Sequence, residues 1–369
     1  MVLLDKVVKR LLEILKKEKP DLHVAKYPTG LDEKLRDFED KVGLQQQQSG
    51  RSQMLGIWGL GGIGKTTLAK EFYNRRKSDF QKSCFLHDVK DNEAKEMQRE
   101  LLESLTGKDE PVTIVDIGTE MLKKHLKSCN ALVILDDVDN VNQVEELLPV
   151  EIRDLHPHSL ILITSRDKQI LISSKVEDSS IYWLRELIPE HSRVLFCSYA
   201  FSQPHPKPTF EALVDRFLEA CKGLPLSLKV FGALLYGRDQ SDWEDELESL
   251  QHILPDEIHN MFKISYNQLN KEEKQIFLDI ACYLIGTDKE TAIGIWNSSG
   301  WRGRKGFQTL QNKCLVELDS FNRIHMHDHV RDLRIEFAES SAPRRLWRRT
   351  KNVVGNLLDS VSVQLFSPL

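Results

Sequence analysis

The nine residues 59–67, Gly-Leu-Gly-Gly-Ile-Gly-Lys-Thr-Thr, constrain the fold of this chain more than any other segment. An apolar run over 54–58 leads into them, and a helical pattern over 68–72 follows them. They match the pattern G-x-x-x-x-G-K-[ST]. In a strand–loop–helix context this pattern lets backbone N–H groups and a helix N-terminus surround a polyphosphate. The sequence therefore predicts a P-loop that binds a nucleoside phosphate.

Two residues of this loop have predicted chemical roles. The Lys65 ammonium neutralises charge near the β- and γ-phosphates, and the Thr66 hydroxyl is a ligand for Mg²⁺. Mg²⁺ is therefore expected to accompany the nucleotide. The residues of this segment that we expect to bind the nucleotide are Gly59, Gly61, Gly62, Ile63, Gly64, Lys65, Thr66 and Thr67.

Bulk properties narrow the class of protein. A chain of 369 residues predicts two or three domains of about 150 residues each. A formal net charge of −5 gives no general attraction to nucleic acids or acidic membranes. The 6 cysteines are scattered without a C-x-x-C pair, which favours a reducing compartment. No signal peptide or membrane span is expected, so we expect a cytoplasmic protein, with the nucleus as a further location.

Apolar runs alternate with amphipathic helical patterns from Gln53 to about Ser174. The alternation predicts an α/β domain in which helices cover both faces of a parallel sheet. Ligands of such sheets bind at the carboxyl ends of the strands, so the polar residues there are candidates for the site. The four runs are Met54–Trp58, Ser83–Leu86, Ala131–Leu135 and Leu160–Thr164.

The pattern changes to helices alone after about residue 180, and a hairpin pattern follows at 315–327. These features predict a helical domain and then a winged-helix domain. Residues 1–50 are expected to form a linker helix (3–19) and a pre-P-loop segment that ends in a polar joint (45–50). The domains that follow are expected at 51–178 for the P-loop domain, 179–254 for the helical domain and 255–345 for the winged helix, with a tail at 346–369.

Charged residues end two of the apolar runs. Asp136 and Asp137 follow Ala131–Leu135, and we assign Asp136 to the Mg²⁺ ion and Asp137 to orienting an attacking water. Rapid P-loop ATPases often carry a longer Glu at the second position, so Asp137 predicts slow hydrolysis. Arg166 follows the run at 160–164, where its guanidinium is placed to sense a γ-phosphate.

Several further short segments, together with the P-loop, occur along the chain in the order that is typical of a known protein family. Their sequence resembles the NB-ARC domain of plant nucleotide-binding leucine-rich-repeat (NLR) immune receptors, and the segments at 137–139 and 277–282 are similar to those of the TIR class. The resemblance covers roughly residues 20 to 350. The segments are Tyr27-Pro28-Thr29-Gly30-Leu31, Cys84-Phe85-Leu86, Leu135-Asp136-Asp137-Val138, Thr164-Ser165-Arg166, Gly223-Leu224-Pro225-Leu226, Phe277–Cys282 and Met326-His327-Asp328.

The resemblance implies a switch of plant defence signalling that binds ADP when closed and opens when ATP replaces it. It implies that Thr29 and Gly30 line the adenine pocket, that Pro225 packs against the base, and that His327 reaches the β-phosphate of ADP. The helical and winged-helix regions would be ARC1-like and ARC2-like. The ATP-bound form would self-associate or associate with full-length receptors.

The same resemblance leads us to expect a chain that has the switch but lacks the TIR domain and the leucine-rich repeats. A truncated receptor, a gene fragment and a natural short form all fit that expectation. Two other functions stay open. One is a conventional P-loop ATPase. The other is a nucleotide-gated DNA-binding regulator that uses the winged helix and a basic run at 344–351. We expect no direct contact with nucleic acid or membrane.

Overall fold

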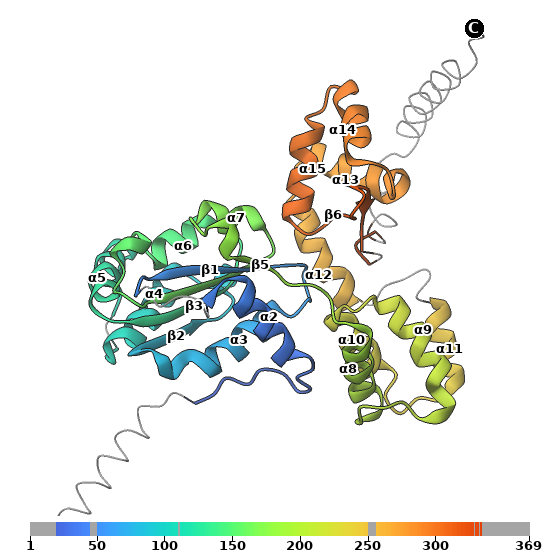
Figure 1. Ribbon diagram of the computed structural model, residues 1–369, viewed down its shortest axis with the longest axis horizontal. Coiled ribbons are helices and arrows are strands. Elements are labelled where there is room, and N and C mark those ends of the chain that lie inside the picture. The colour runs from blue at the N-terminus through green and yellow to red at the C-terminus, as the bar shows by residue number, and fades with distance from the viewer. Residues whose placement is uncertain are drawn as a thin grey trace, which may run out of the picture. The chain divides into compact units, whose positions relative to one another are not determined.

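The chain divides into two compact units, residues 1–237 and 238–369. Figure 1 labels the helices and strands of both units. The computed structural model describes residues 20–44, 50–109, 111–249, 256–327, 329–331 and 333. Several sequence-based expectations fall wholly or largely outside those residues. They are the linker helix at 3–19, the polar joint at 45–50, the last position of the motif at 326–328, the basic run at 344–351 and the tail at 346–369.

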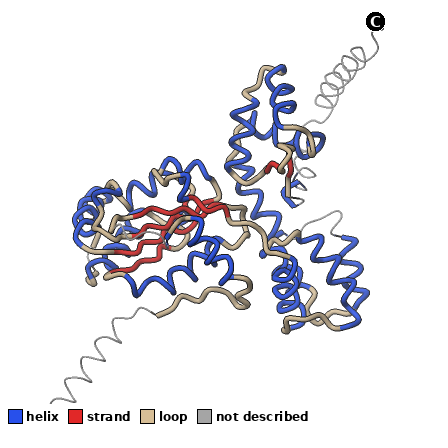
Figure 2. Tube along the Cα trace, viewed as in Figure 1, coloured by secondary structure: helices blue, strands red, loops and turns tan. Residues whose placement is uncertain are grey.

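A parallel sheet forms the centre of the first unit (Figure 2). Its strand order is β2-β3-β4-β1-β5, and all four pairings are parallel. The carboxyl ends of the strands therefore meet at one edge. The strands are β1 (Gln53–Trp58), β2 (Lys82–Leu86), β3 (Ala131–Val138), β4 (Leu160–Ser165) and β5 (Ile181–Trp183).

The four predicted strands are confirmed, and a fifth was missed. Residues 181–183 form β5, which pairs with β1. The expectation that only helices follow residue 180 was therefore wrong for this strand. Three residues are too few to show the alternation or the apolar run by which a strand is detected in a sequence. The predicted domain boundaries, including the one at 178, stay predictions.

Helices cover both faces of this sheet. Figure 1 shows α3 along one face and α6 and α7 along the other. The strands are apolar almost throughout because both faces are buried, and Leu132–Leu135 in β3 have no exposed surface. The helices are α2 (Leu31–Lys41), α3 (Lys65–Arg76), α4 (Ala94–Thr106), α5 (Val115–Ser128), α6 (Val141–Leu147) and α7 (Lys168–Ser173), with short 3-10 turns at Lys77–Asp79, Val89–Asp91, Ile152–Asp154 and Asp178–Ser180.

A three-helix cluster completes the first unit and confirms the helices predicted there. Its helices are α8 (Pro189–Phe201), α9 (Glu211–Cys221) and α10 (Pro225–Leu234). The ring of Phe217 links them, because it lies 5.7 Å from the Phe196 ring of α8 and 5.8 Å from the Phe231 ring of α10. Proline at the first position starts both α8 and α10, where its missing N–H has no helical partner to lose.

The second unit contains helices and a short antiparallel hairpin, as expected for a winged-helix region. Its helices are α11 (Gln240–Ser249), α12 (Asp256–Asn267), α13 (Lys271–Asp279), a π-helical turn (Ile280–Leu284), α14 (Lys289–Ser298) and α15 (Gly303–Asn312). In the hairpin, β6 (Glu317–Leu318) pairs with β7 (Ile324–His325). The buried Trp296 indole donates a hydrogen bond of 3.1 Å to Asp279 Oδ2, which joins α14 to α13. Within the described ranges of both units, no helix combines the length and the apolar character that a membrane span requires.

Candidate functional site

The P-loop folds around its own lysine. Lys65 begins α3, and its buried Nζ donates to Gly59 O at 2.9 Å and to Leu60 O at 3.1 Å. The ammonium thus lies across the loop where a phosphate chain would bind. Gly62 and Gly64 have φ of +76° and +99°, which residues with a side chain rarely adopt.

The other P-loop residues predicted to bind the nucleotide are in this segment as well. Gly59, Gly61 and Ile63 belong to the connection between β1 and α3, and Ile63 is buried. Thr66 and Thr67 lie in the first turn of α3.

Asp136 contacts the first turn of α3. The Thr66 hydroxyl lies 3.0 Å from Asp136 Oδ1 and 2.9 Å from Oδ2, and the Thr164 hydroxyl donates to Oδ1 at 2.7 Å. Asp136 is fully buried, and this burial raises the pKa of its carboxyl despite the two hydrogen bonds. Nearby Asp137 and Asp88 raise that pKa further. The carboxyl therefore lies in a place that a cation would stabilise.

A Mg²⁺ ion fits these residues. A threonine hydroxyl beside one carboxylate is the kind of protein contact that Mg²⁺ makes when phosphates and waters supply its other ligands. Among the described residues no group of three or more His, Cys, Asp or Glu side chains could hold a metal ion by itself. The pair Thr66 and Asp136 suits a nucleotide-bound ion better than a structural one.

Asp137 lies at an irregularity in β3. The pairing of β3 with β4 shifts between Leu135 and Val138, and Asp137 has a φ of +56°. Its backbone N–H donates to the Thr164 hydroxyl at 2.9 Å. Thr164 therefore positions both acidic residues, because the same hydroxyl oxygen bonds to Asp136.

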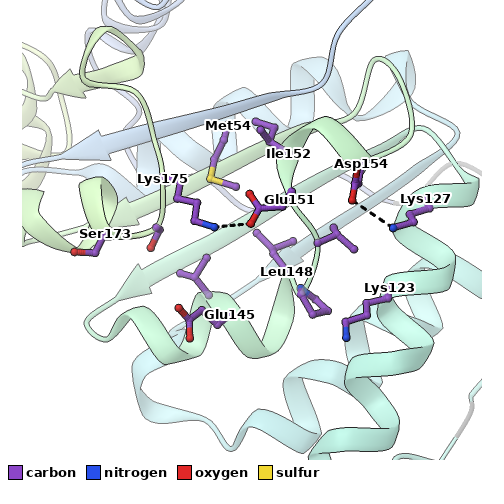
Figure 3. Close-up of a pocket in the computed structure, with 14 residues that line it drawn as sticks. Met54, Lys123, Lys127, Glu145, Leu148, Glu151, Ile152, Asp154, Ser173 and Lys175 are labelled. Carbon is purple, nitrogen blue, oxygen red and sulfur yellow. Dashed lines mark hydrogen bonds and ion pairs between the residues drawn. The ribbon is translucent and has the colours of Figure 1, made fainter.

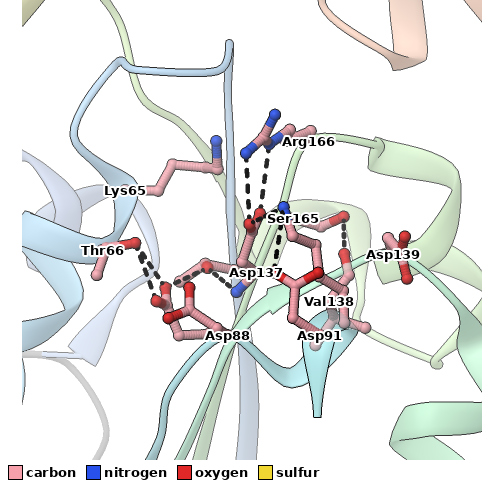
Figure 4. Close-up of polar contacts among 12 residues, drawn as sticks. Lys65, Thr66, Asp88, Asp91, Asp137, Val138, Asp139, Ser165 and Arg166 are labelled. Carbon is pink, nitrogen blue, oxygen red and sulfur yellow. Dashed lines mark hydrogen bonds and ion pairs between the residues drawn. The ribbon is translucent and has the colours of Figure 1, made fainter. Parts of the chain in front are cut away.

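Two cations bind the Asp137 carboxylate. Lys90 Nζ lies 2.7 Å from Oδ2. Arg166 Nε lies 3.4 Å from Oδ1, and Figure 4 shows the Arg166 guanidinium facing this carboxylate. Burial alone would raise the pKa of Asp137, but Arg166 and Lys90 outweigh burial and hold it below its usual value. The side chain is therefore an anion at neutral pH.

The segment that contains Pro225 meets the P-loop directly. Leu226, the residue after Pro225 in α10, donates its backbone N–H to Gly62 O at 3.2 Å. A Cβ atom on Gly62 would lie only 2.7 Å from Leu226 Cβ. Pro225 thus begins a helix whose first turn touches the loop that binds phosphate.

Thr29 and Gly30 are connected to the start of the P-loop indirectly, through residues 184–186. Gly30, with φ of +67°, precedes α2 and packs against the His191 ring of α8. Lys34 of α2 donates to Glu186 O at 3.2 Å, and nearby Leu184 donates its N–H to Trp58 O at 2.8 Å. The pre-P-loop segment is therefore tied to residues that flank the start of the loop.

His327 belongs to the second unit, so its predicted contact with the nucleotide stays a prediction. Its backbone carbonyl accepts hydrogen bonds from Val330 and Arg331, both at 2.9 Å, and its Nδ1 accepts the N–H of His329 at 3.2 Å. The side chain therefore caps the helical residues that follow it. Because Nδ1 accepts this bond, the neutral ring carries its proton on Nε2.

Reasoning from the sequence assigned no role to Lys90 or to the Thr164 hydroxyl. Lys90 lies a few residues beyond the end of β2, and nothing in its spacing relates it to Asp137. The one available signal was the expectation that polar residues after parallel strands gather at one edge. That signal becomes specific only when β2 is known to lie next to β3.

A separate cavity lies away from this site (Figure 3). It has a volume of about 410 Å³ and is lined by Met54 near the start of β1 and by residues of α5, α6 and α7. Four of its charged residues form two ion pairs: Lys175 lies 2.6 Å from Glu151, and Lys127 lies 3.5 Å from Asp154. None of the predicted nucleotide-binding residues lines it.

The parallel sheet, the P-loop and the acidic end of β3 define the class of protein: a P-loop NTPase fold. Two solved structures share the fold. A Walker-type ATPase of Pyrococcus abyssi has a TM-score of 0.52 and 12% identity, over 85% of this chain and 99% of that chain. The Aeropyrum pernix ORC2 protein, solved in ADPNP–ADP complexes, has a TM-score of 0.51 and 14% identity, over 87% of this chain and 97% of that chain.

Family comparisons give the more specific assignment. The model of the NB-ARC domain matches residues 38–205, and that of the Roq1-like disease resistance protein winged-helix domain matches residues 270–340. The chain contains an NB-ARC domain and a winged-helix domain of the plant disease resistance type, and the NB-ARC fold implies that it binds a nucleotide.

Curated relatives agree with that assignment. Disease resistance protein RUN1 of Vitis rotundifolia is 34% identical over 86% of this chain and 24% of its own length. TMV resistance protein N of Nicotiana glutinosa is 31% identical over 85% of this chain and 28% of its own length. The chain thus spans about a quarter of the length of the relatives that it matches.

Proposed function

We propose that this chain is the nucleotide-operated switch of a plant disease resistance protein, with ADP bound in a closed resting state and ATP in an open, signalling state. The observation that carries the proposal is the contact of Thr66 with Asp136, 2.9 Å apart, beside a lysine enclosed by its own P-loop. This arrangement suits a Mg²⁺-nucleotide. Adenine is the base, in a pocket lined by Thr29, Gly30 and Pro225.

Slow hydrolysis resets the switch. Asp137 orients the attacking water, and Asp136 with Thr66 holds Mg²⁺. The Asp137 carboxylate in this structure is paired with Lys90 and Arg166, so it must be released from these cations before it can orient a water. A short, charge-paired acid of this kind supports a reset step better than a rapid metabolic turnover.

His327 closes the resting state by donating its Nε2–H to the β-phosphate of ADP. The cap that His327 forms with the His329 N–H supports this role, since it leaves the ring proton on the other nitrogen. ATP binding at the P-loop then favours the state in which this contact is absent, as a two-state equilibrium requires.

The open form associates with itself or with full-length receptors in the cytoplasm. The formal charge of −5 supports a protein surface as the partner rather than nucleic acid. Both associations are proposals about a longer protein as well as about this chain, because the match covers only 24% of RUN1 and 28% of resistance protein N.

The nucleotide that co-purifies with the chain tests the proposal. We expect ADP in near-stoichiometric amount after native purification, denaturation and chromatography of the extract. Lys65→Ala should yield none, because it removes the cation that offsets phosphate charge in the loop. Lys108→Ala, at an exposed position after α4, is the matched control and should retain ADP. Folded wild-type protein without adenine nucleotide would contradict the proposal.

A further inference from the structure

Lys90 lies at the edge of the sheet where the carboxyl ends of the strands meet. It follows β2, a strand after which no site residue was predicted. It belongs to the 3-10 turn Val89–Asp91, shortly after the end of β2. The preceding Asp88 has a φ of +47°, a left-handed conformation that turns the chain at this point. Because β2 pairs with β3, the turn lies beside the end of β3, where Asp137 is located.

The side chain of Lys90 is held in place by Asp137. Lys90 Nζ lies 2.7 Å from Asp137 Oδ2, and the two side chains are only 15% and 14% exposed. Its other carboxylate neighbour, Asp91, is more distant at 3.9 Å and is 68% exposed, so solvent screens it. A lysine that is this enclosed needs an anion close to it.

Three cations from separate segments act on the same carboxylate. Lys90 approaches one oxygen, and Arg166 contacts both, at 3.4 Å in each case. Lys65 of the P-loop also lowers the pKa of Asp137 by its charge. The fully buried Asp136 is directed toward the hydroxyls of Thr66 and Thr164 instead. The charges of Lys90, Arg166 and Lys65 therefore all act on the Asp137 carboxylate.

We propose that Lys90 binds the γ-phosphate of ATP, and that the Asp137 carboxylate takes the place of this phosphate between Lys90 and Arg166 when a diphosphate is bound. The inference rests on the proposed nucleotide switch and deepens it. A γ-phosphate brings more negative charge than one carboxylate and can accept from several donors at once. Its arrival lets Lys90 exchange the carboxylate for a phosphate oxygen.

This exchange connects nucleotide recognition to hydrolysis. With ADP, Asp137 Oδ2 accepts hydrogen bonds from both Lys90 and Arg166, which together occupy the acceptor sites of this oxygen. With ATP, Lys90 moves to phosphate, and the released oxygen can orient the attacking water. A purely structural ion pair that holds the turn after β2 would show no preference between the two nucleotides.

Binding of ADP and of the non-hydrolysable analogue AMP-PNP, each with Mg²⁺, separates these possibilities. For Lys90→Met we expect affinity for AMP-PNP to fall about tenfold or more, while affinity for ADP changes less than about twofold. Lys90→Arg should keep most of the AMP-PNP affinity. Lys95→Met, at an exposed position in α4, is the control and should change neither affinity.

Asp137→Asn gives an independent test with the opposite sign. Removing the competing carboxylate should raise affinity for AMP-PNP relative to ADP, and adding Lys90→Met should abolish that gain. Equal losses for both nucleotides in Lys90→Met, or an unchanged preference in Asp137→Asn, would overturn the role of Lys90. In that case, retained ADP binding by the wild type would still support the proposed nucleotide switch. Failure of the folded wild type to bind either nucleotide would overturn both.

Discussion

The Thr66 hydroxyl lies 2.9 Å from Asp136 Oδ2 and joins the first turn of the P-loop helix to the end of β3. The two residues come from segments far apart in the sequence. They meet because only one strand, β4, lies between β3, which carries Asp136, and β1, which leads into the P-loop and Thr66. Thr164, on that intervening strand, bonds to Asp136 and receives the N–H of Asp137. One hydroxyl thereby fixes the positions of two acids with different roles.

The division of roles between these acids predicts different kinetic effects. Asp136→Asn should weaken Mg²⁺-dependent nucleotide binding, because it removes the charge that faces the ion. Asp137→Asn should leave Mg²⁺-dependent ADP binding intact and slow single-turnover ATP hydrolysis by about a hundredfold or more. Titrations with and without Mg²⁺, combined with rapid-quench measurements, check both effects. Similar defects in the two variants would mean that the roles are not divided in this way.

The close approach of Gly62 to α10 predicts a specific cost for an added methyl group. Gly62→Ala puts a Cβ 2.7 Å from Leu226 Cβ, whereas Gly43, with a similar φ of +70°, has nothing within 4 Å. Both alanines incur left-handed strain of about 1–2 kcal/mol. Only Gly62→Ala should lose a further 1–3 kcal/mol, roughly, through overpacking, and weaken ADP binding. Thermal unfolding of the two variants compares them, and equal losses would show that the contact with Leu226 is unimportant.

The two nitrogens of His327 predict separable effects. His327→Asn can still accept the His329 N–H but cannot reach the phosphate, so thermal stability should be kept and ADP should dissociate faster. A charge-assisted hydrogen bond of about 1.5–3 kcal/mol corresponds to one to two powers of ten in that rate. His327→Gln places an amide donor nearer the Nε2 position but loses the cap. Its release of ADP should therefore be slower than that of His327→Asn, although its thermal stability should be lower. Stopped-flow displacement of a fluorescent ADP measures the rates. An ADP off-rate that both substitutions leave unchanged would show that His327 is an ordinary helix cap.

The buried Asp279 predicts a pH dependence of stability in the second unit. Burial raises the pKa of this carboxyl to about 6, although the Trp296 indole stabilises its anion. Between the unfolded value near 4 and the folded value, the folded state binds more protons, so its stability falls as pH rises through this range. Asp279→Asn should remove this slope and gain up to about 3 kcal/mol above pH 7. Urea unfolding at pH 4.5, 6 and 7.5 would reveal the change, and an unaltered slope would argue against it.

Most of the nucleotide site was predictable from the sequence because its chemistry is local. The loop glycines, Lys65 and Thr66 form one segment, and the buried strands are apolar on both faces, so each is visible without tertiary information. Lys90 was not predictable in this way, because its relation to Asp137 depends on the strand order. The left-handed backbone of Asp137 and the contact of Gly62 with Leu226 likewise arise only from packing between distant segments.

The response of the purified chain to a change of nucleotide tests the switch most directly. Light scattering after size-exclusion chromatography would compare the ADP-bound chain with the chain exchanged into Mg²⁺ and AMP-PNP. The proposed switch predicts a compact particle with ADP and an expanded or self-associated one with AMP-PNP, with His327→Asn shifted toward the second form. The same mass and the same hydrodynamic radius in both nucleotides, at confirmed full occupancy, would contradict it.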